Sequence, residues 1–178
     1  MAVYDFESKI VSIPDYPEPG VIFKDITPLF DDAEALQAVV DEIADHFKGA
    51  GITKVVGSEA RGFLIGAPVA YKLKAGFVPA RKPGKLPRAV YSQSYSLEYG
   101  TDTLEMHKDA LDADDVVLVI DDLVATGGTT VATAKLASQS GAKVAGFAFI
   151  LELAFLDPRK AIAQAYPDTE VFSLVKVN

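Results

Sequence analysis

The chain has 178 residues, a formal net charge of −8 and an apolar fraction of 49%. These values exclude a disordered chain, which would lack the apolar surface that offsets chain entropy, and the length predicts one domain over residues 1–178. With no cysteine, a disulfide framework and a thiolate zinc site are excluded. The acidic balance argues against nucleic acid as a partner. The most apolar stretch, residues 144–156, is too short to span a bilayer and contains Glu152, so we expect no membrane partner and a cytoplasmic location.

Strand and helix patterns alternate along the chain. In the first half of the chain we predict an opening helix over 4–11, a helix from Asp31 or Asp32 to about Lys48, a strand over 54–57, a helix over 60–74 and a strand over 77–80. A β-hairpin over 90–97 and 103–107 is predicted next. In the last third we predict a strand over 116–120, a helix over 129–140, a strand over 142–151, a helix over 159–165 and a strand over 170–175. This alternation predicts an α/β fold, a Rossmann-like parallel sheet flanked by helices. Ligands of such sheets bind at the carboxyl ends of the strands.

The segment from residue 116 to residue 130 combines several features that suit a sugar phosphate. A buried strand ends in Asp121 and Asp122, a turn with Gly127 and Gly128 follows, and then a helix begins. Paired glycines let the backbone curl its N–H groups inward, and the helix start adds partial positive charge, which together make a phosphate cradle. The carboxylates accept hydrogen bonds from hydroxyls and bind Mg²⁺. The plainer interpretation is that the acids only end a strand and the glycines only make a turn.

This segment resembles the phosphoribosyl pyrophosphate (PRPP) binding motif of the type I phosphoribosyltransferases. Further segments are similar to those of the family's adenine-specific members: residues 15–26 to the N-terminal base-binding segment, 57–64 to the pyrophosphate loop, and 81–87 and 95–100 to two later loops. The resemblance runs from about residue 10 to residue 174 in the same order. It implies that residues 1–30 form a small N-terminal hood that binds the base, and that residues 90–107 form a mobile hairpin lid.

The reaction that the resemblance implies is the Mg²⁺-dependent transfer of ribose 5-phosphate from PRPP to adenine, giving AMP and pyrophosphate in purine salvage. The substrates are small molecules, Mg²⁺ is held mainly by substrate oxygens and water rather than by a protein metal site, and a homodimer is expected. Two alternatives stay open. The chain could transfer to another nucleobase, or it could be a catalytically silent regulator that senses PRPP.

The resemblance also assigns residues to each part of the substrates. The 5′-phosphate is assigned to Ala125, Thr126, Gly127, Gly128 and Thr129, and the ribose hydroxyls to Asp121 and Asp122. Pyrophosphate is assigned to Ser58, Glu59, Ala60, Arg61, Arg81, Lys82 and Lys85, and adenine to Val21, Phe23, Lys24 and Leu153. The Glu59–Ala60 bond matches a position where the family carries a non-proline cis peptide.

Proton transfer is expected to involve the hairpin lid. Relatives that act on 6-oxopurines carry an acid in the phosphate loop, but here Ala125 stands at that position and cannot transfer a proton. The family's candidate is Glu98, with Tyr99 beside it on the lid, and Arg61 is the second residue expected to be catalytic. A carboxylate carried by a closing lid can share the proton of the base while the lid expels water.

Overall fold

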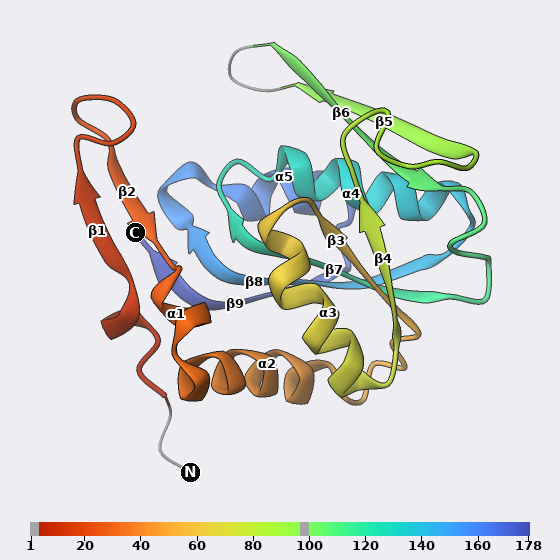
Figure 1. Cartoon of the computed structure of the whole chain (residues 1–178). Coiled ribbons are helices and arrows are strands. Elements are labelled where there is room, and N and C mark those ends of the chain that lie inside the picture. Colours follow the sequence, from red (N-terminus) through yellow and green to blue (C-terminus); the bar gives the residue numbers. More distant parts are fainter. Residues whose placement is uncertain (1–3, 97–99) are drawn as a thin grey trace.

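The computed structural model describes residues 4–96 and 100–178, and a parallel sheet forms its centre (Figure 1). Among these residues, five strands pair in the order β4, β3, β7, β8, β9. Their bounds are Lys54–Ser58 for β3, Gly76–Ala80 for β4, Val116–Val124 for β7, Lys143–Leu153 for β8 and Glu170–Val177 for β9. Each neighbouring pair is parallel. The predicted α/β class with a parallel sheet is therefore confirmed.

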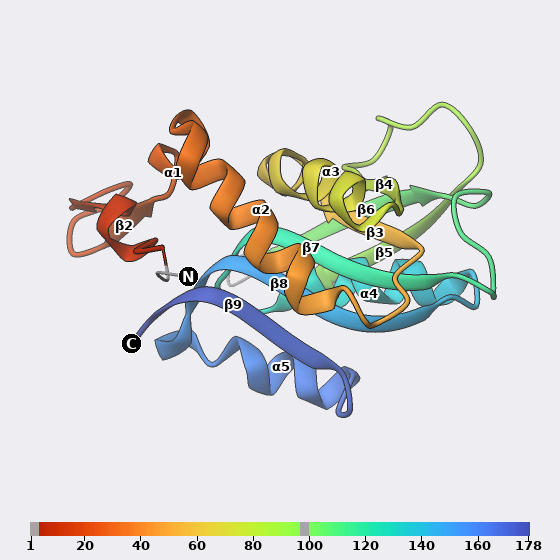
Figure 2. The same cartoon turned by 90° about the horizontal axis from the view of Figure 1, so that it is seen from below.

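Helices cover both faces of this sheet (Figure 2). One face carries α2 (Ala33–Phe47) and α3 (Arg61–Leu73), and the other carries α4 (Gly128–Gln139) and α5 (Pro158–Ala165). Side chains alternate along β7, so Leu118 and Ile120 pack in the core cluster with α2 and α3, while Val117 and Val119 pack in the cluster with α4. Because both faces of β7 are buried, its sequence is a continuous apolar run rather than an alternating one.

The helix predicted from Asp31 or Asp32 is α2. Asp32 caps it, because one oxygen of its carboxylate accepts hydrogen bonds from the backbone N–H groups of Glu34 and Ala35, at 2.9 and 3.1 Å. A one-turn helix that the sequence did not predict, α1 (Pro28–Asp31), comes directly before it. Within the described residues, no helix is both long enough and apolar enough to cross a membrane.

Two antiparallel hairpins accompany the sheet. The first, β1 (Val11–Pro14) with β2 (Ile22–Asp25), lies beside the ends of β8 and β9, and the second, β5 (Val90–Ser96) with β6 (Thr101–His107), lies over α4 (Figure 1). The second hairpin was predicted, although its expected tip at residues 97–99 lies outside the described residues. The first was not predicted.

Two predictions of local structure are wrong. The opening helix over 4–11 is only a 3₁₀ turn, η1 (Glu7–Lys9), after which the chain enters β1. The strand expected to end at Ile120 continues to Val124, because Asp121, Leu123 and Val124 still pair with β8. The acid pair therefore lies within the strand rather than after it. A second 3₁₀ turn, η2 (Ala154–Leu156), follows β8 and was also not predicted.

Candidate active site at the carboxyl ends of β3 and β7

A cavity of about 360 Å³ opens at the carboxyl ends of β3 and β7. From these two central strands the chain proceeds outward in opposite directions, to β4 on one side and to β8 and β9 on the other. Such a reversal leaves a crevice between the strand ends, which is where open α/β sheets bind ligands. The predicted site residues that line the cavity are Ser58, Glu59, Ala60, Arg61, Lys82, Asp121, Asp122, Ala125, Thr126, Gly127, Gly128 and Thr129.

The predicted phosphate loop connects β7 to α4. Gly127 caps the helix with a φ of +87°, a left-handed conformation that favours glycine. A Cβ at this position would lie 3.1 Å from the carbonyl oxygen of Pro158, so the loop is also packed tightly against the start of α5. The first N–H groups of α4 have no acceptor within the helix itself and carry its positive dipole end. The loop is therefore built to bind an anion.

The two acids beside the loop are held differently. The Ser58 hydroxyl donates a hydrogen bond to Asp121 Oδ2. Arg61 Nε lies 2.7 Å from Asp122 Oδ2, yet the N–H is not aligned with that oxygen, which has no hydrogen bond to any described residue. Asp122, which lines the cavity, thus keeps a buried oxygen without a hydrogen bond among the described residues.

Helix α3 starts so close to this pair that only a glycine fits. A Cβ on Gly62 would lie 2.8 Å from Asp121 Oδ1. Burial, followed by the negative charge of Asp122, raises the pKa of Asp121 to about 8, although the hydrogen bond from Ser58 opposes the rise. At neutral pH the raised pKa therefore favours the protonated form of Asp121.

Carboxylates also engage the cations of the predicted pyrophosphate site. Arg81 donates from Nε and Nη2 to Glu59 Oε2, at 3.3 and 3.1 Å, and the backbone N–H of Lys82 donates to the other oxygen. Burial acts to raise the pKa of Glu59, but these donors outweigh it and hold that pKa below its ordinary value. The Glu59–Ala60 peptide bond is cis, as the resemblance implied. Arg81 and Lys85 do not line the cavity of the described residues.

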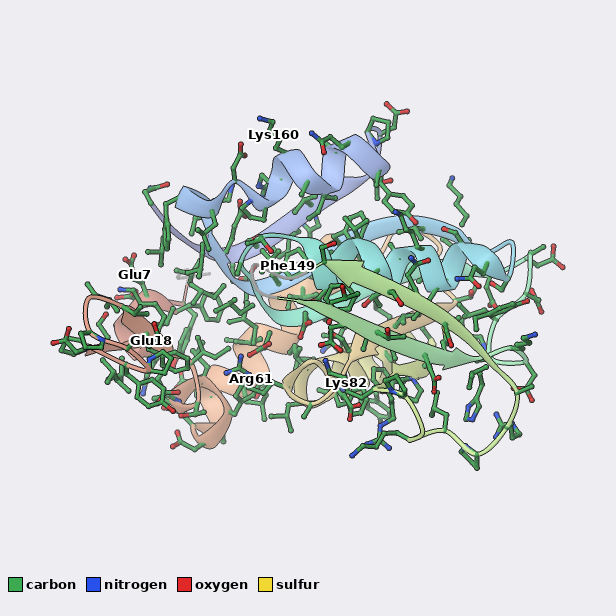
Figure 3. All side chains as sticks on the ribbon, turned by 90° about the horizontal axis from the view of Figure 1, so that it is seen from above. Glu7, Glu18, Arg61, Lys82, Phe149 and Lys160 are labelled. Carbon is green, nitrogen blue, oxygen red and sulfur yellow. The ribbon has the colours of Figure 1, made fainter. Side chains whose placement is uncertain are left out.

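The predicted adenine residues lie apart from this cavity. Phe23 packs edge-on against Tyr16, with ring centroids 5.3 Å apart, and Lys24 Nζ donates to Ser12 Oγ at 2.8 Å. Val21 is exposed beside β2, and Leu153 is the last residue of β8. None of the four lines the cavity that the described residues form. Arg61 and Lys82, labelled in Figure 3, both line the cavity, whereas Glu18 of the first hairpin does not.

Sequence reasoning missed several residues of the cavity wall. They are Tyr95, Asp102, Leu104, Leu123 and Val124. A signal for Asp102 existed, because strand side chains alternate and Asp102 shares a face of β6 with the buried Leu104 and Met106. The predicted Glu98 and Tyr99 lie outside the described residues.

Comparison with known proteins gives the same picture over the whole chain. A family model described as the phosphoribosyl transferase domain matches residues 28–178. An adenine phosphoribosyltransferase of Aeromonas salmonicida is 54% identical, over 96% of this chain and 93% of that protein. The solved adenine phosphoribosyltransferase of Thermoanaerobacter pseudethanolicus superposes with a TM-score of 0.90 at 46% identity, covering 97% of this chain and 98% of that chain. That of Giardia lamblia, complexed with 9-deazaadenine, gives a TM-score of 0.92 at 39% identity, covering 100% and 99%.

The chain belongs to the phosphoribosyltransferase family, because the family model and these relatives match it over most of its length. Its parallel sheet, with the acid pair and the predicted phosphate loop at the ends of the central strands, agrees with that assignment. The chain is therefore a transferase of pentosyl groups. Within that family it falls among the adenine phosphoribosyltransferases.

Proposed function

We propose that this chain transfers ribose 5-phosphate from PRPP to adenine in the cavity at the ends of β3 and β7, forming AMP and pyrophosphate. The observation that carries the proposal is the meeting of three units in one cavity: a glycine loop at a helix start, a pair of acids, and a cationic edge. These match the phosphate, the hydroxyls and the pyrophosphate of PRPP. The Giardia lamblia relative, complexed with an adenine analogue, supports adenine as the acceptor.

In this proposal each part of PRPP has its own partners. The 5′-phosphate binds the backbone of residues 125–129, and the ribose hydroxyls donate to Asp121 and Asp122. The buried Asp122 Oδ2, which has no aligned donor among the described residues, supports this role because a hydroxyl would supply one. Pyrophosphate binds residues 58–61 together with Arg81, Lys82 and Lys85. Charge that develops on the leaving pyrophosphate is stabilised by cations already fixed in position.

Magnesium fits this cavity as a partner of the substrate. The described residues contain no cluster of three or more metal-ligating side chains. Two adjacent carboxylates nevertheless suit Mg²⁺, which proteins often bind through one or two carboxylates and substrate phosphates. When bound, the ion would be held mainly by substrate oxygens and water, with Asp121 and Asp122 as candidate carboxylate partners, and it would supply positive charge that neutralises the pyrophosphate group.

In this proposal, binding of adenine and transfer of its proton depend on the two segments outside the parallel sheet. Adenine lies between Phe23 and Leu153, and backbone groups near Val21 and Lys24 bind its edge, so residues 1–30 act as the base-binding hood. Residues 90–107 act as the lid, and Glu98, beside Tyr99, accepts or shares the proton of the base. Each of these segments contains an antiparallel hairpin that lies outside the parallel sheet.

The working unit in this proposal is a homodimer in the cytoplasm. Leu64 and Tyr71, seven residues apart on α3, are 55% and 86% exposed. Two large apolar side chains on the outer face of a helix support a contact with a second copy. The cytoplasmic location stays a prediction from composition.

A base screen tests the proposed function. The purified protein is incubated with PRPP, Mg²⁺ and, separately, adenine, hypoxanthine, guanine, xanthine, uracil and orotate, and nucleotide and pyrophosphate are measured. We expect AMP from adenine alone. Product from another base would contradict the assignment of adenine, and PRPP binding without any product would favour a PRPP-sensing regulator.

A further inference from the structure

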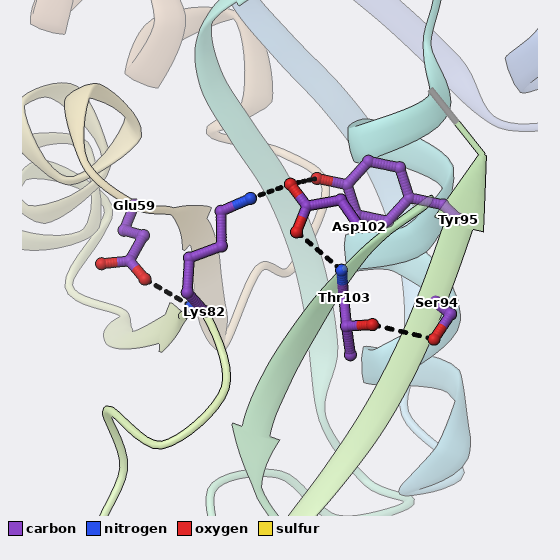
Figure 4. Close-up of polar contacts among 6 residues, drawn as sticks. All are labelled: Glu59, Lys82, Ser94, Tyr95, Asp102 and Thr103. Atoms are coloured by element: carbon purple, nitrogen blue, oxygen red, sulfur yellow. Dashed lines mark hydrogen bonds and ion pairs between the residues drawn. The ribbon is translucent and has the colours of Figure 1, made fainter. Parts of the chain in front are cut away.

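The side chain of Lys82 extends toward Asp102 on the second hairpin (Figure 4), and both residues line the cavity. Its backbone N–H is fixed on Glu59, at the pyrophosphate loop. Its Nζ reaches Asp102 Oδ2, on strand β6 of the hairpin. Among the described residues, Asp102 is the only acceptor of the Lys82 ammonium, so two of the three N–H donors of that group remain for a ligand.

Asp102 is itself held firmly in the wall of the cavity. Its Oδ1 accepts the backbone N–H of Thr103 at 2.8 Å, and its Oδ2 accepts the hydroxyl of Tyr95 at 3.3 Å. Tyr95 and Asp102 are cross-strand partners in the hairpin. Asp102 also shares a strand face with Leu104, which is 1% exposed. The carboxylate therefore has a fixed position from which to hold the lysine.

We propose that Asp102 is a positioning residue, which holds the Lys82 ammonium at the pyrophosphate end of the cavity. The inference deepens the proposed function and rests on it. A free lysine side chain loses rotamer entropy when it binds an anion, and a lysine that is already held loses less. Since Lys82 is assigned to pyrophosphate, Asp102 favours PRPP binding without contacting PRPP.

A second ion pair nearby shows what an ordinary surface contact looks like. Arg88 donates to both oxygens of Asp109, at 3.1 Å each, but these side chains are 58% and 65% exposed and do not line the cavity. The side chains of Lys82 and Asp102 are 43% and 26% exposed and both line it. Exposed pairs of the first kind contribute little, so Asp109 offers a matched control from the same loop region.

The first experiment compares Asp102→Asn, Asp102→Glu and Asp109→Asn by calorimetric titration in the presence of Mg²⁺, with PRPP, inorganic pyrophosphate and ribose 5-phosphate as separate ligands. We expect Asp102→Asn to weaken binding of PRPP and pyrophosphate about tenfold, as loss of a charge-assisted contact does, and to leave ribose 5-phosphate unaffected. Asp102→Glu should recover part of the loss, and Asp109→Asn should bind as the unaltered protein does. Equal weakening of all three ligands would overturn the proposal, since it would indicate a general structural effect.

A double-mutant cycle then tests whether Asp102 acts through Lys82. We expect the variant that combines Lys82→Ala with Asp102→Asn to bind pyrophosphate no more weakly than Lys82→Ala alone. If the losses of affinity caused by the two substitutions add in the double variant, Asp102 does not act through Lys82 and the positioning role is overturned. Tighter binding of pyrophosphate by Asp102→Asn would overturn it as well, because Asp102 would then compete with the ligand for Lys82. Failure of the proposed function is seen separately, as absence of AMP from the unaltered protein in the base screen.

Discussion

The cavity and the N-terminal hairpin are built from opposite kinds of structure. The cavity is formed at the ends of buried strands, where Ser58 is 3% exposed and Asp122 is 4% exposed. All four residues of β1 are exposed, and Ile22 on β2 is 61% exposed. The groups assigned to phosphate and ribose are therefore fixed by the core, whereas the groups assigned to the base depend on a small hairpin. The part of the site assigned to PRPP, at the strand ends, is therefore more preformed than the part assigned to adenine, on the first hairpin.

Electrostatics separates the two regions as well. Among the described residues, four carboxyl groups and two cations line the cavity, and both cations are engaged by carboxylates. In the hairpin, Lys24 contacts only a serine hydroxyl among the described residues. An anionic substrate must therefore join existing ion pairs in the cavity, whereas a neutral base meets mostly apolar surface at the hairpin.

The largest effect is expected from the two acids of the cavity. Replacing both Asp121 and Asp122 by Asn removes the carboxylates assigned to the ribose hydroxyls and leaves Arg61 without its charged partner. We expect kcat/KM for PRPP to fall about a thousandfold, the scale for breaking a buried charged contact. Steady-state kinetics with PRPP as the varied substrate measures this.

The matched variant in the hairpin is Phe23→Leu. It should raise KM for adenine and leave KM for PRPP unchanged, because Phe23 does not line the cavity. If Phe23→Leu changed KM for PRPP as strongly as the acid variant does, the division of the site into two halves would be wrong.

The next effect concerns Glu98, the residue to which the resemblance assigns proton transfer. Glu98→Gln keeps the size of the side chain and removes its basicity, so we expect kcat to fall about a hundredfold. The dissociation constant for adenine should change little. Rapid-quench kinetics of AMP formation measures the chemical step directly, and an unaltered rate of that step would reject the proton role of Glu98.

The sequence predicted the site best where residues that act together lie close together in one segment. Residues 116–130 carry strand, acids, turn and helix start in one stretch, and the structure brings Asp121, Asp122 and Gly127 into one cavity as expected. The extent of β7 was misjudged, because pairing with β8 continues through the acids, and no local pattern reports what a neighbouring strand does.

Features that depend on pairing between distant segments could not be predicted. The strands of the first hairpin have four residues each, and β1 is exposed at every position, so no alternation marks it. The contact between Lys82 and Asp102 joins residues 20 positions apart. The backbone bridge between Arg81 and Glu105 places the segment of Lys82 beside β6, and no local pattern reports that bridge.

A smaller effect is expected in the pH dependence of stability. The pKa of Asp121 is raised to about 8 from an ordinary value of 3.8, so the folded state retains a proton that the unfolded chain loses. The stability that this proton contributes is complete below pH 3.8 and is lost as the pH rises towards 8. Urea unfolding from pH 6 to pH 8 should show the native protein losing on the order of 1 kcal/mol per pH unit relative to Asp121→Asn.

The control for that titration is Asp109→Asn. The hydrogen bond from Arg88 lowers the pKa of Asp109, so its contribution is already complete above its ordinary pKa and stays constant from pH 6 to pH 8. A constant stability difference between the native protein and Asp121→Asn over this range would contradict the raised pKa.

The smallest effect compares one glycine from each region. Gly20, in the turn of the first hairpin, and Gly127, at the start of α4, both have a φ of +87°. A Cβ on Gly20 would meet nothing within 4 Å, whereas a Cβ on Gly127 would lie 3.1 Å from the carbonyl oxygen of Pro158. Alanine at either position adopts an unfavourable left-handed conformation, which costs about 1 kcal/mol. We expect Gly127→Ala to cost about 1 kcal/mol more, because backbone atoms must shift to admit the methyl group.

Denaturant unfolding of Gly20→Ala and Gly127→Ala isolates this packing cost, because the two variants share the same backbone strain. If the core holds the phosphate loop tightly, Gly127→Ala lowers the free energy of unfolding more than Gly20→Ala does. Only Gly127→Ala should then also bind ribose 5-phosphate more weakly. Equal destabilisation would mean that the loop at the start of α4 yields as easily as an exposed turn. The cavity would then be no more preformed than the hairpin, and the contrast between the two halves of the site would fail.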